Sequence, residues 1–409
     1  MRACPELRDT CEGADRARSP RVHLLPARRT PRVLSLGLAR AARRSRGSQT
    51  EGGTRATRRR AGLVAVAALT LGVAGCSDVS TLPGAGASSQ EVAMTAWVAG
   101  FQDTHPDVVT SYDPVGSGTG REMFLNSAVL FAGSDAAMKE KELARAQERC
   151  FGGDVVELPL YISPIAIAYN LPGLGTDHLR LRPETIAALF NGDITRWNDP
   201  AIAETNPGVT LPDLPVVPVN FFNDTATTEN FTEYLAATAG DAWPHEPSET
   251  WPRSGTQSGA QTSGLIGTLQ GAEGTIGYAD AAQVPDTLGT VAVGVGEDFV
   301  PVSPEAAAAV VDVSPPAPDA TDLRLTVDLA RDTTQPDTYP VVLISYTLAC
   351  SRYDNETDVA NVKAMLSYIA SEPGQQRAAD PSVAGSAPIS EALRQRVDAA
   401  IGQIAVAAP

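Results

Sequence analysis

The stretch VVELPLYISPIAIAYNL, residues 155–171, decides how the rest of this chain is interpreted. It is rich in the β-branched residues Val and Ile, so it predicts a long strand. Outward from it, further runs predict strands at 107–114, 131–135, 214–219, 274–278 and 340–348. Apolar residues at helical spacing predict helices that begin at residues 88 and 121. The same spacing predicts further helices at 139–148, 183–190, 225–237, 362–369 and 393–401. Strands that alternate with helices along the whole chain indicate an α/β fold.

Length, composition and charge narrow the classes of protein to which this sequence can belong. The chain has 409 residues, of which 43% are hydrophobic and 20% charged. That is enough for two domains with apolar cores, and it excludes a wholly disordered chain. The formal net charge of −16 disfavours nucleic acid as a partner. The charge is uneven, because residues 1–60 hold 16 Arg and 5 acidic residues, whereas residues 76–409 hold 16 basic and 43 acidic residues.

Residues 58–76, RRRAGLVAVAALTLGVAGC, have the pattern of an export signal. Three Arg residues precede an uncharged stretch of 15 residues, which is short for a membrane span and fits the apolar region of a signal peptide. The small residues before Cys76 resemble a bacterial lipobox. We therefore expect residues 58–75 to be removed and Cys76 to be lipidated, with a plain secretory signal as the alternative.

Lipidation would anchor the protein to the outer face of the cytoplasmic membrane. We expect a part of the protein to be secreted as well. Residues 76–83 are expected to form a tether between the anchor and the fold. Residues 1–57 are either a disordered basic leader or lie upstream of the true start codon, so they are excluded from the fold.

Two of the five cysteines remain for the folded part of an exported chain, Cys150 and Cys350. Export favours a disulfide between them. Their spacing matches no metal-binding motif. Two buried free thiols are the alternative.

Three turns rich in small polar residues each precede a predicted helix, at 88–89, 116–120 and 225–227. A helix N-terminus presents free N–H groups and the positive end of the helix dipole, so three such ends could bind one tetrahedral oxyanion. Asp135, in a Gly-Ser-Asp turn, adds a carboxylate to this set. Ordinary helix capping is the alternative for each turn taken alone, and SSQE at 88–91 reads as a capping box.

A hydrolase would need a nucleophile and a base, and the mature chain offers little material for either. Its histidines, His105, His178 and His245, lie in polar, loop-like contexts. The sequence has no GxSxG elbow, no HExxH or Cys/His cluster and no Walker A motif. We therefore expect no enzymatic activity, no metal and no cofactor.

Seven segments carry a family resemblance: GAGASSQ (84–90), YDPVGSGTG (112–120), FAGSDAAM (131–138), LFNGDITRWNDPAI (189–202), TTENFTEYL (227–235), GTIGYAD (274–280) and GSAPIS (385–390). On these segments the chain resembles the phosphate-binding proteins of bacterial ABC phosphate importers, the PstS family, over nearly all of residues 84–402. The resemblance implies a type II periplasmic-binding-protein clamshell, in which two α/β lobes are joined by two crossing strands. Lobe one would comprise residues 84–162 and 341–409, and lobe two residues 163–340. It also implies a monomer that binds inorganic phosphate and delivers it to the importer's permease subunits.

The resemblance also implies which residues hold the phosphate. Ser88 and Ser117 match hydroxyl and N–H donors, and Asp135 matches the carboxylate that accepts the proton of a phosphate O–H. The second-lobe loop contributes Thr225, Ala226 and Thr227. Sulfate carries no proton at neutral pH, and a site that needs a ligand hydrogen bond rejects an analogue lacking it by about 10⁴–10⁵-fold.

The second-lobe loop departs from the family pattern Arg-x-Asp-x-Ser-Gly-Thr. Phe221 stands where the family has the Arg that grips phosphate, and Asn223 stands where it has the Asp that orients this Arg. Three interpretations follow: residues 220–226 are a sequence error over an intact family loop, phosphate binds weakly through the remaining donors, or the ligand has changed. The alternative function is therefore that of a surface lipoprotein that keeps the fold with weakened, altered or lost anion binding. Arg253 is a candidate to replace the missing guanidinium, with an ordinary surface Arg as the alternative.

Overall fold

The computed structural model describes residues 79–176 and 178–408. The expected leader, the signal peptide and the lipidation site at Cys76 lie outside the described residues. Within the described part, no helix is both long and apolar enough to cross a membrane.

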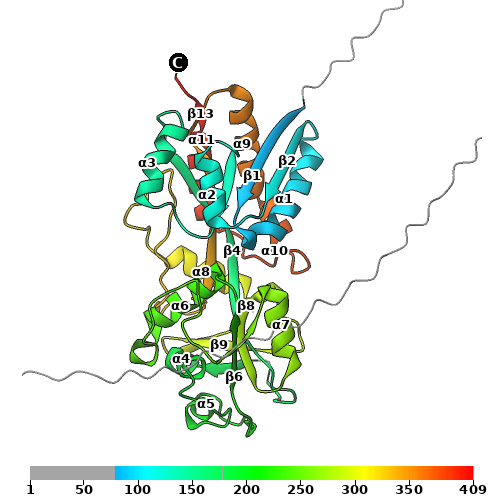
Figure 1. The fold of residues 1–409 in the computed structure, drawn as a ribbon, viewed down its shortest axis with the longest axis vertical. Helices are drawn as coiled ribbons and strands as arrows, with labels where there is room; N and C mark the ends of the chain where they lie inside the picture. Colours follow the sequence, from blue (N-terminus) through cyan, green and yellow to red (C-terminus); the bar gives the residue numbers. More distant parts are fainter. Residues whose placement is uncertain (1–78, 177, 409) are drawn as a thin grey trace, which may run out of the picture. The chain divides into compact units, whose positions relative to one another are not determined.

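One 11-stranded sheet runs through two lobes of the described chain and joins them (Figure 1). In the upper lobe of Figure 1, β1 (Ser80–Gly86) pairs in parallel with β2 (Val108–Asp113) and β3 (Phe131–Ser134). The antiparallel hinge strands β4 (Val155–Tyr169) and β11 (Val342–Cys350) continue into the lower lobe. The remaining strands of this sheet are β5 (His178–Leu181), β6 (Val217–Phe221), β7 (Gln257–Gly259), β8 (Thr275–Asp280), β9 (Gly289–Val295) and β10 (Asp298–Val300). The predicted α/β clamshell with two crossing strands is confirmed.

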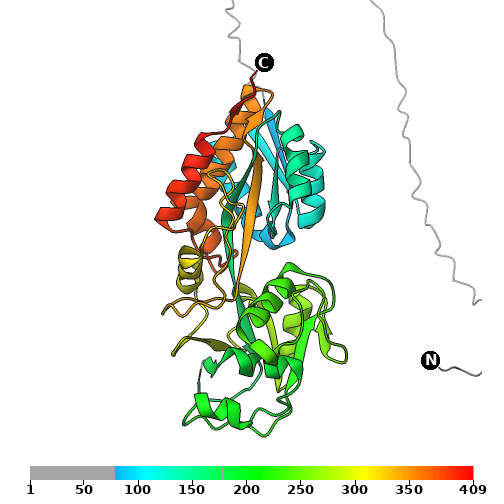
Figure 2. The same cartoon turned by 90° about the vertical axis from the view of Figure 1, so that its left-hand side faces the viewer.

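Helices cover the sheet of each lobe. The upper lobe carries α1 (Glu91–Thr104), α2 (Ser117–Leu125), α3 (Glu140–Arg149), α9 (Glu356–Ala370), α10 (Glu372–Ala379) and α11 (Glu391–Gly402). The lower lobe carries α4 (Pro183–Asn191), α5 (Pro200–Thr205), α6 (Ala226–Thr238) and α7 (Gln261–Gly271), and α8 (Pro304–Val313) lies beside the hinge strands. Figure 2 shows α9 and α11 on one face of the upper sheet and α2 and α3 on the other.

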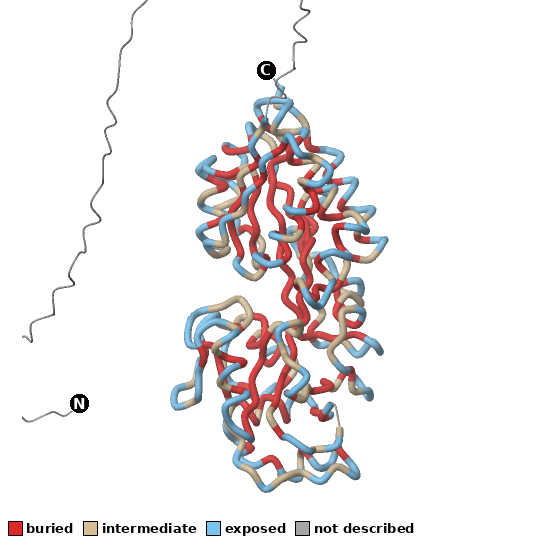
Figure 3. Tube along the Cα trace, turned by 90° about the vertical axis from the view of Figure 1, so that its right-hand side faces the viewer, coloured by how far each residue is buried: buried red, intermediate tan, exposed pale blue. Residues whose placement is uncertain are grey.

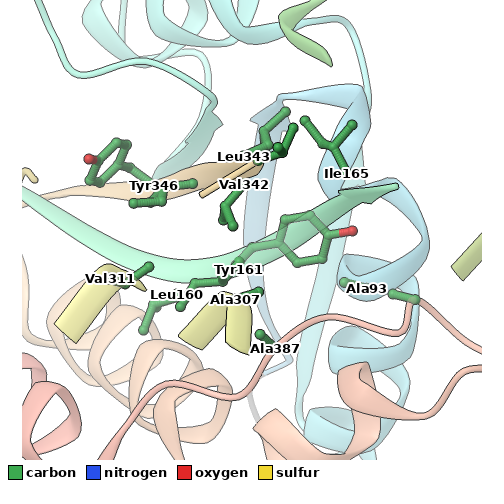
Figure 4. Packing of buried hydrophobic residues seen from close by; sticks show 14 of the residues in the cluster. Ala93, Leu160, Tyr161, Ile165, Ala307, Val311, Val342, Leu343, Tyr346 and Ala387 are labelled. Carbon is green, nitrogen blue, oxygen red and sulfur yellow. The ribbon is translucent and has the colours of Figure 1, made fainter. Parts of the chain in front are cut away.

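The hinge strands are predominantly apolar, as expected of strands that are buried on both faces. Every residue of β4 and β11 is buried, and Figure 3 shows buried residues running without a break from one lobe into the other. Close up, Ala307 and Val311 of α8 lie beside Leu160 of β4 (Figure 4). The stretch at 155–171 is therefore the core of the hinge as well as a strand.

Part of the range expected in lobe two, residues 163–340, lies against lobe one instead. The backbone N–H of Glu157 in β4 donates to the carbonyl of Leu323, and the N–H of Leu325 donates back to the carbonyl of Glu157 (both 2.9 Å). Arg324 between them forms an ion pair with Glu157, a carboxylate that is fully buried within β4. A buried charge needs such a partner, so the ion pair and the two backbone hydrogen bonds together hold residues 323–325 against the upper lobe.

Two local expectations are wrong. Residues 80–83, expected as part of the tether, belong to β1 because their backbone pairs with β2. The capping box at 88–91 does not form, since 88–90 make a 3₁₀ turn and α1 begins at Glu91 without a side-chain cap. The predictions also miss α7, α8 and β9, although Val291, Val293 and Val295 alternate along β9 and are buried.

Cys150, at the end of α3, and Cys350, at the end of β11, form a disulfide in the structure. Both residues are fully buried in the upper lobe. The bridge therefore joins two elements of one lobe and does not cross between the lobes.

Candidate functional site

A cavity of about 660 Å³ lies between the lobes and is lined by the ends of helices from both. All six residues predicted to bind phosphate line it: Ser88, Ser117 and Asp135 from the upper lobe, and Thr225, Ala226 and Thr227 from the lower lobe. The structure thus brings together residues that are widely separated in the sequence. Their roles in binding remain a prediction.

Asp135 follows β3 and is held by serine hydroxyls. Ser89 and Ser345 each donate to Oδ1 at 2.5 Å, and Ser117 donates to Oδ2 at 3.3 Å. The backbone N–H of Asp135 donates to the Ser117 hydroxyl at 3.1 Å, which ties β3 to the start of α2. Burial raises the pKa of the Asp135 carboxyl above its ordinary value, and the bonds from Ser345, Ser89 and Ser117 lower it in part.

The upper lobe offers hydrogen-bond donors that the protein itself does not use. The Ser88 hydroxyl has no partner among the described residues, because the expected cap is not formed. Helix α2 begins at Ser117 without a side-chain cap, after Gly116 with φ +91°. Glycine tolerates this backbone conformation. The first N–H groups of α2 have no partner within the helix, and Ser117, Gly118 and Thr119 of its first turn line the cavity.

In the lower lobe, Thr225 caps α6 and does not present its hydroxyl freely. Its Oγ1 accepts from the N–H of Thr228 at 3.0 Å and donates to the Thr228 hydroxyl at 3.0 Å. The N–H groups of Ala226 and Thr227, in the first turn of the helix, are left for a ligand. The Thr225 hydroxyl, which was expected to donate to the ligand, therefore caps the helix instead. Helix capping is the alternative that the sequence left open for this turn.

Several lining residues were outside the predicted set. Helix α7 brings Gln261, Thr262 and Ser263 to the cavity and begins without a side-chain cap, so it is a fourth helix N-terminus there. Ser163 on β4 donates to Oδ2 of Asp280 at 2.5 Å, and both line the cavity. Burial raises the pKa of Asp280, while its bond to Ser163 lowers it in part. The sequence carries one sign of such positions, a polar residue inside an apolar run. Ser163, which lines the cavity, is one example, and Ser345, which bonds to Asp135, is another.

The electrostatics of the cavity are unusual for an anion site. Its lining residues include five carboxyl groups, those of Glu91, Asp135, Asp224, Glu249 and Asp280. No Lys, Arg or His of the described chain is among them. Neutral hydroxyls and helix ends would therefore have to supply all the attraction for an anion.

The departures from the family loop account for the missing cation. Phe221 is 3% exposed, lines the cavity and packs its ring against Tyr278 at a centroid distance of 5.7 Å. Asn223 accepts from the N–H of Gln261 at 3.4 Å. Arg253 does not replace the guanidinium, because its Nη1 donates to the carbonyl of Phe190 at 2.8 Å, outside the cavity lining.

The described part of the chain offers no evident metal site. The described residues contain no group of three or more His, Cys, Asp or Glu side chains arranged to hold a metal ion. His105, His178 and His245 do not line the cavity.

Comparison with known proteins shows that the chain is similar to the PBP superfamily and to phosphate-binding proteins. A family model described as "PBP superfamily domain" matches residues 48–373. The phosphate-binding protein PstS2 of Mycobacterium bovis is 32% identical over 341 residues, which cover 82% of this chain and 90% of that protein. The phosphate-binding protein PstS 3 of Mycobacterium leprae is 33% identical over 342 residues, covering 82% of this chain and 89% of the relative.

Solved structures show the same fold. A phosphate-binding protein from Stenotrophomonas maltophilia superposes with a TM-score of 0.54 at 20% identity, covering 78% of this chain and 93% of that chain. A high-affinity periplasmic phosphate-binding protein, PfluDING, solved with bound phosphate at pH 8.5, gives a TM-score of 0.59 at 20% identity with the same coverage.

Proposed function

Because this chain belongs to the PBP superfamily and, within it, to the PstS phosphate-binding proteins, we propose that it captures inorganic phosphate in the cavity between its lobes. It acts outside the cytoplasm as the substrate-binding subunit of an ABC importer. The bound phosphate passes to the importer's permease subunits when the lobes open. The protein works as a monomer and performs no chemistry on its ligand.

The observation that carries this proposal is the convergence of one carboxylate and several helix ends on one cavity. Asp135 and the uncapped start of α2 face it from the upper lobe, and the first turn of α6 faces it from the lower lobe. Helix N-termini favour anions through their free N–H groups and their dipole. Contacts from both lobes are what closure over a small ligand requires.

Asp135 supplies the specificity in this proposal. Its carboxylate accepts a hydrogen bond from the O–H of hydrogen phosphate, whereas sulfate has no proton to donate and is repelled. The net charge of the protein does not prevent anion binding, because charges beyond about 8–10 Å are screened at physiological ionic strength. The donors and carboxyl groups that line the cavity therefore weigh more than the charges on the rest of the surface.

A second candidate function rests on the composition of the cavity lining. With five carboxyl groups, no basic side chain among the lining residues and the ring of Phe221 in its wall, the cavity also suits a neutral or partly apolar ligand. This candidate predicts that phosphate does not compete for the site.

Isothermal titration calorimetry with phosphate in excess sulfate tests the proposal. We expect saturable binding that sulfate does not displace, and Asp135→Asn should reduce the preference for phosphate over sulfate, by up to about 10⁴-fold. Asp113→Asn, an exposed carboxyl outside the cavity lining, is the matched control. Absence of phosphate binding at millimolar concentration, or equal displacement by sulfate, would contradict the proposal.

We also propose that Cys76 carries the lipid that anchors the protein to the outer face of the membrane. The apolar stretch and the small residues before Cys76 support this. Cys76→Ala is expected to move the protein from the membrane fraction to the medium or periplasm without changing phosphate affinity. Retention of the variant in the membrane fraction would oppose a lipid anchor at this residue.

A further inference from the structure

Behind the cavity, a chain of hydrogen bonds leads from a buried glutamine to Asp135. Nε2 of Gln90 donates to the Ser345 hydroxyl at 2.6 Å, and that hydroxyl donates to Oδ1 of Asp135 at 2.5 Å. Gln90 and Ser345 are both fully buried. Ser345 lies on the hinge strand β11, and it does not itself line the cavity.

The direction of each bond in this chain is determined. Nε2 of Gln90 also donates to the carbonyl of Tyr346 at 3.2 Å, and a carbonyl can only accept, so the amide group cannot be turned the other way. A hydroxyl has a single proton. Since Ser345 receives a hydrogen bond from Gln90, its own proton is committed to Asp135.

This arrangement makes the two oxygens of Asp135 unequal. Oδ1 accepts from both Ser345 and Ser89 at 2.5 Å, whereas Oδ2 has only the longer contact of 3.3 Å with Ser117. Oδ2 is therefore the oxygen with capacity left for a donor on a ligand. The two short bonds also favour the charged carboxylate over its protonated form.

We infer that Ser345 is a positioning residue that sets the anion specificity of this site, by holding Asp135 as a carboxylate with Oδ2 presented to a ligand hydroxyl. The inference rests on the proposed function, because it names the device by which that site distinguishes a protonated oxyanion from an unprotonated one. A protonated Asp135 would donate a hydrogen bond to sulfate and so lose the distinction, whereas a carboxylate can only accept. Gln90 supports Ser345 from the core.

Other titratable groups face Asp135 and are the same in every variant compared below. They are Arg121 on α2, Tyr112 on β2, Tyr161 on β4 and Glu229 on α6. A difference between variants therefore reports the Ser345 bond and not a change in these neighbours.

Ser345→Ala is the test, with two measurements on the same protein. A ¹³C NMR titration of the Asp135 carboxyl is expected to show a higher pKa than in the parent, since a donor to the charged form is lost. Calorimetry is expected to show that the ratio of the sulfate Kd to the phosphate Kd falls about 10- to 100-fold, the loss of one hydrogen bond to a charged group. Ser345→Thr, which keeps the hydroxyl, should restore both values.

Thr347→Val is the matched control. Thr347 lies on the same strand, is also fully buried, and its hydroxyl has no hydrogen-bond partner in the described chain. We expect this variant to leave the Asp135 titration and the ratio unchanged. Gln90→Met, which leaves Ser345 in place, should produce a smaller change in the same direction.

Two results would overturn the inference: no change in the titration or the ratio for Ser345→Ala, or an equal change for Thr347→Val. If the parent protein binds neither phosphate nor sulfate, the proposed function fails. The titration of Asp135 then still decides whether Ser345 holds its carboxylate.

Discussion

Restoring a cation to the cavity tests the electrostatics of the site most directly. The double variant Phe221→Arg, Asn223→Asp places a guanidinium where the family pattern has one and a carboxylate beside it. Phe221 is 3% exposed and lines the cavity, so the new group faces a ligand and not bulk water. No basic side chain of the described chain already lines the cavity to mask the effect.

The expected gain follows from the cost of an unpaired buried charge. Removing one partner of a buried, hydrogen-bonded charge pair costs about 2–5 kcal/mol. At about 1.4 kcal/mol for each tenfold change in Kd, this corresponds to about 30- to 4,000-fold. A point-charge attraction of about 4 kcal/mol, for two charges about 4 Å apart at an effective dielectric constant of about 20, falls within this range. We expect the phosphate affinity of the double variant to rise by a factor of this size.

Calorimetry of the parent and the double variant with phosphate, in excess sulfate, measures the gain. Phe222→Arg is the matched control, because it adds the same charge one residue away. The Phe222 side chain is 77% exposed and does not line the cavity, so we expect less than about a twofold change there, where solvent screens the charge. Our reasoning is refuted if the double variant gains nothing or if the control gains as much.

Resequencing codons 216–230 of the gene tests whether residues 220–226 are a sequence error. An Arg codon at 221 and an Asp codon at 223 would make the double variant the natural protein, and its affinity the natural affinity. Unchanged codons would make the cavity without a cation a real property of this protein. In that case the parent's own affinity decides between weak phosphate binding and a changed ligand.

Three further predictions concern stability and are measured by urea unfolding. Replacing Cys150 and Cys350 by Ser should lower the unfolding free energy by about 2–5 kcal/mol, since the bridge spans 200 residues; an unchanged phosphate affinity would confirm that it does not act on the hinge. Arg324→Met should cost about 3–5 kcal/mol because it leaves its buried glutamate partner unpaired, whereas Arg145→Met, in an exposed pair, should change little; equal losses would contradict this. Burial raises the pKa of Asp280 above its ordinary value of about 4. The contribution of this carboxyl to stability is therefore largest below about pH 4 and is lost as the pH rises through the raised pKa of the native state. Asp280→Asn should lose less stability than the parent between pH 4 and 7, and parallel curves of stability against pH would refute the assignment.

Features of the fold that depend on local pattern could be predicted from the sequence. The run at 155–171 predicts β4 within two residues at its C-terminal end, because a strand buried on both faces is predominantly apolar. The short segment 323–325 could not be placed. It is held by two backbone hydrogen bonds to Glu157 and by the ion pair of Arg324 with that buried carboxylate, and no local pattern expresses contacts between such distant segments.

In the candidate site, too, some residues can be predicted from local sequence and others depend on contacts between distant segments. Ser88, Ser117 and Asp135 are found by motif, since each lies in a turn whose small residues are themselves a signal. Ser345 and Ser163 lie inside apolar strands, where a single serine reads as a tolerated polar residue. Their importance depends on which face of the strand meets a carboxyl group, and pairing between distant strands decides that.

The placement of these two serines bears on how the lobes close. Ser345 on β11 bonds to Asp135 in the upper lobe, and Ser163 on β4 bonds to Asp280 at the end of β8 in the lower lobe. Each hinge strand therefore holds one carboxyl group of the cavity, and the register pairs Leu343 of β11 with Ser163 of β4. A rotation of the lobes about the hinge must either carry each carboxyl with its strand or break a short hydrogen bond. The two hinge strands therefore contribute directly to the candidate site, because each fixes the position of one carboxyl group that lines the cavity.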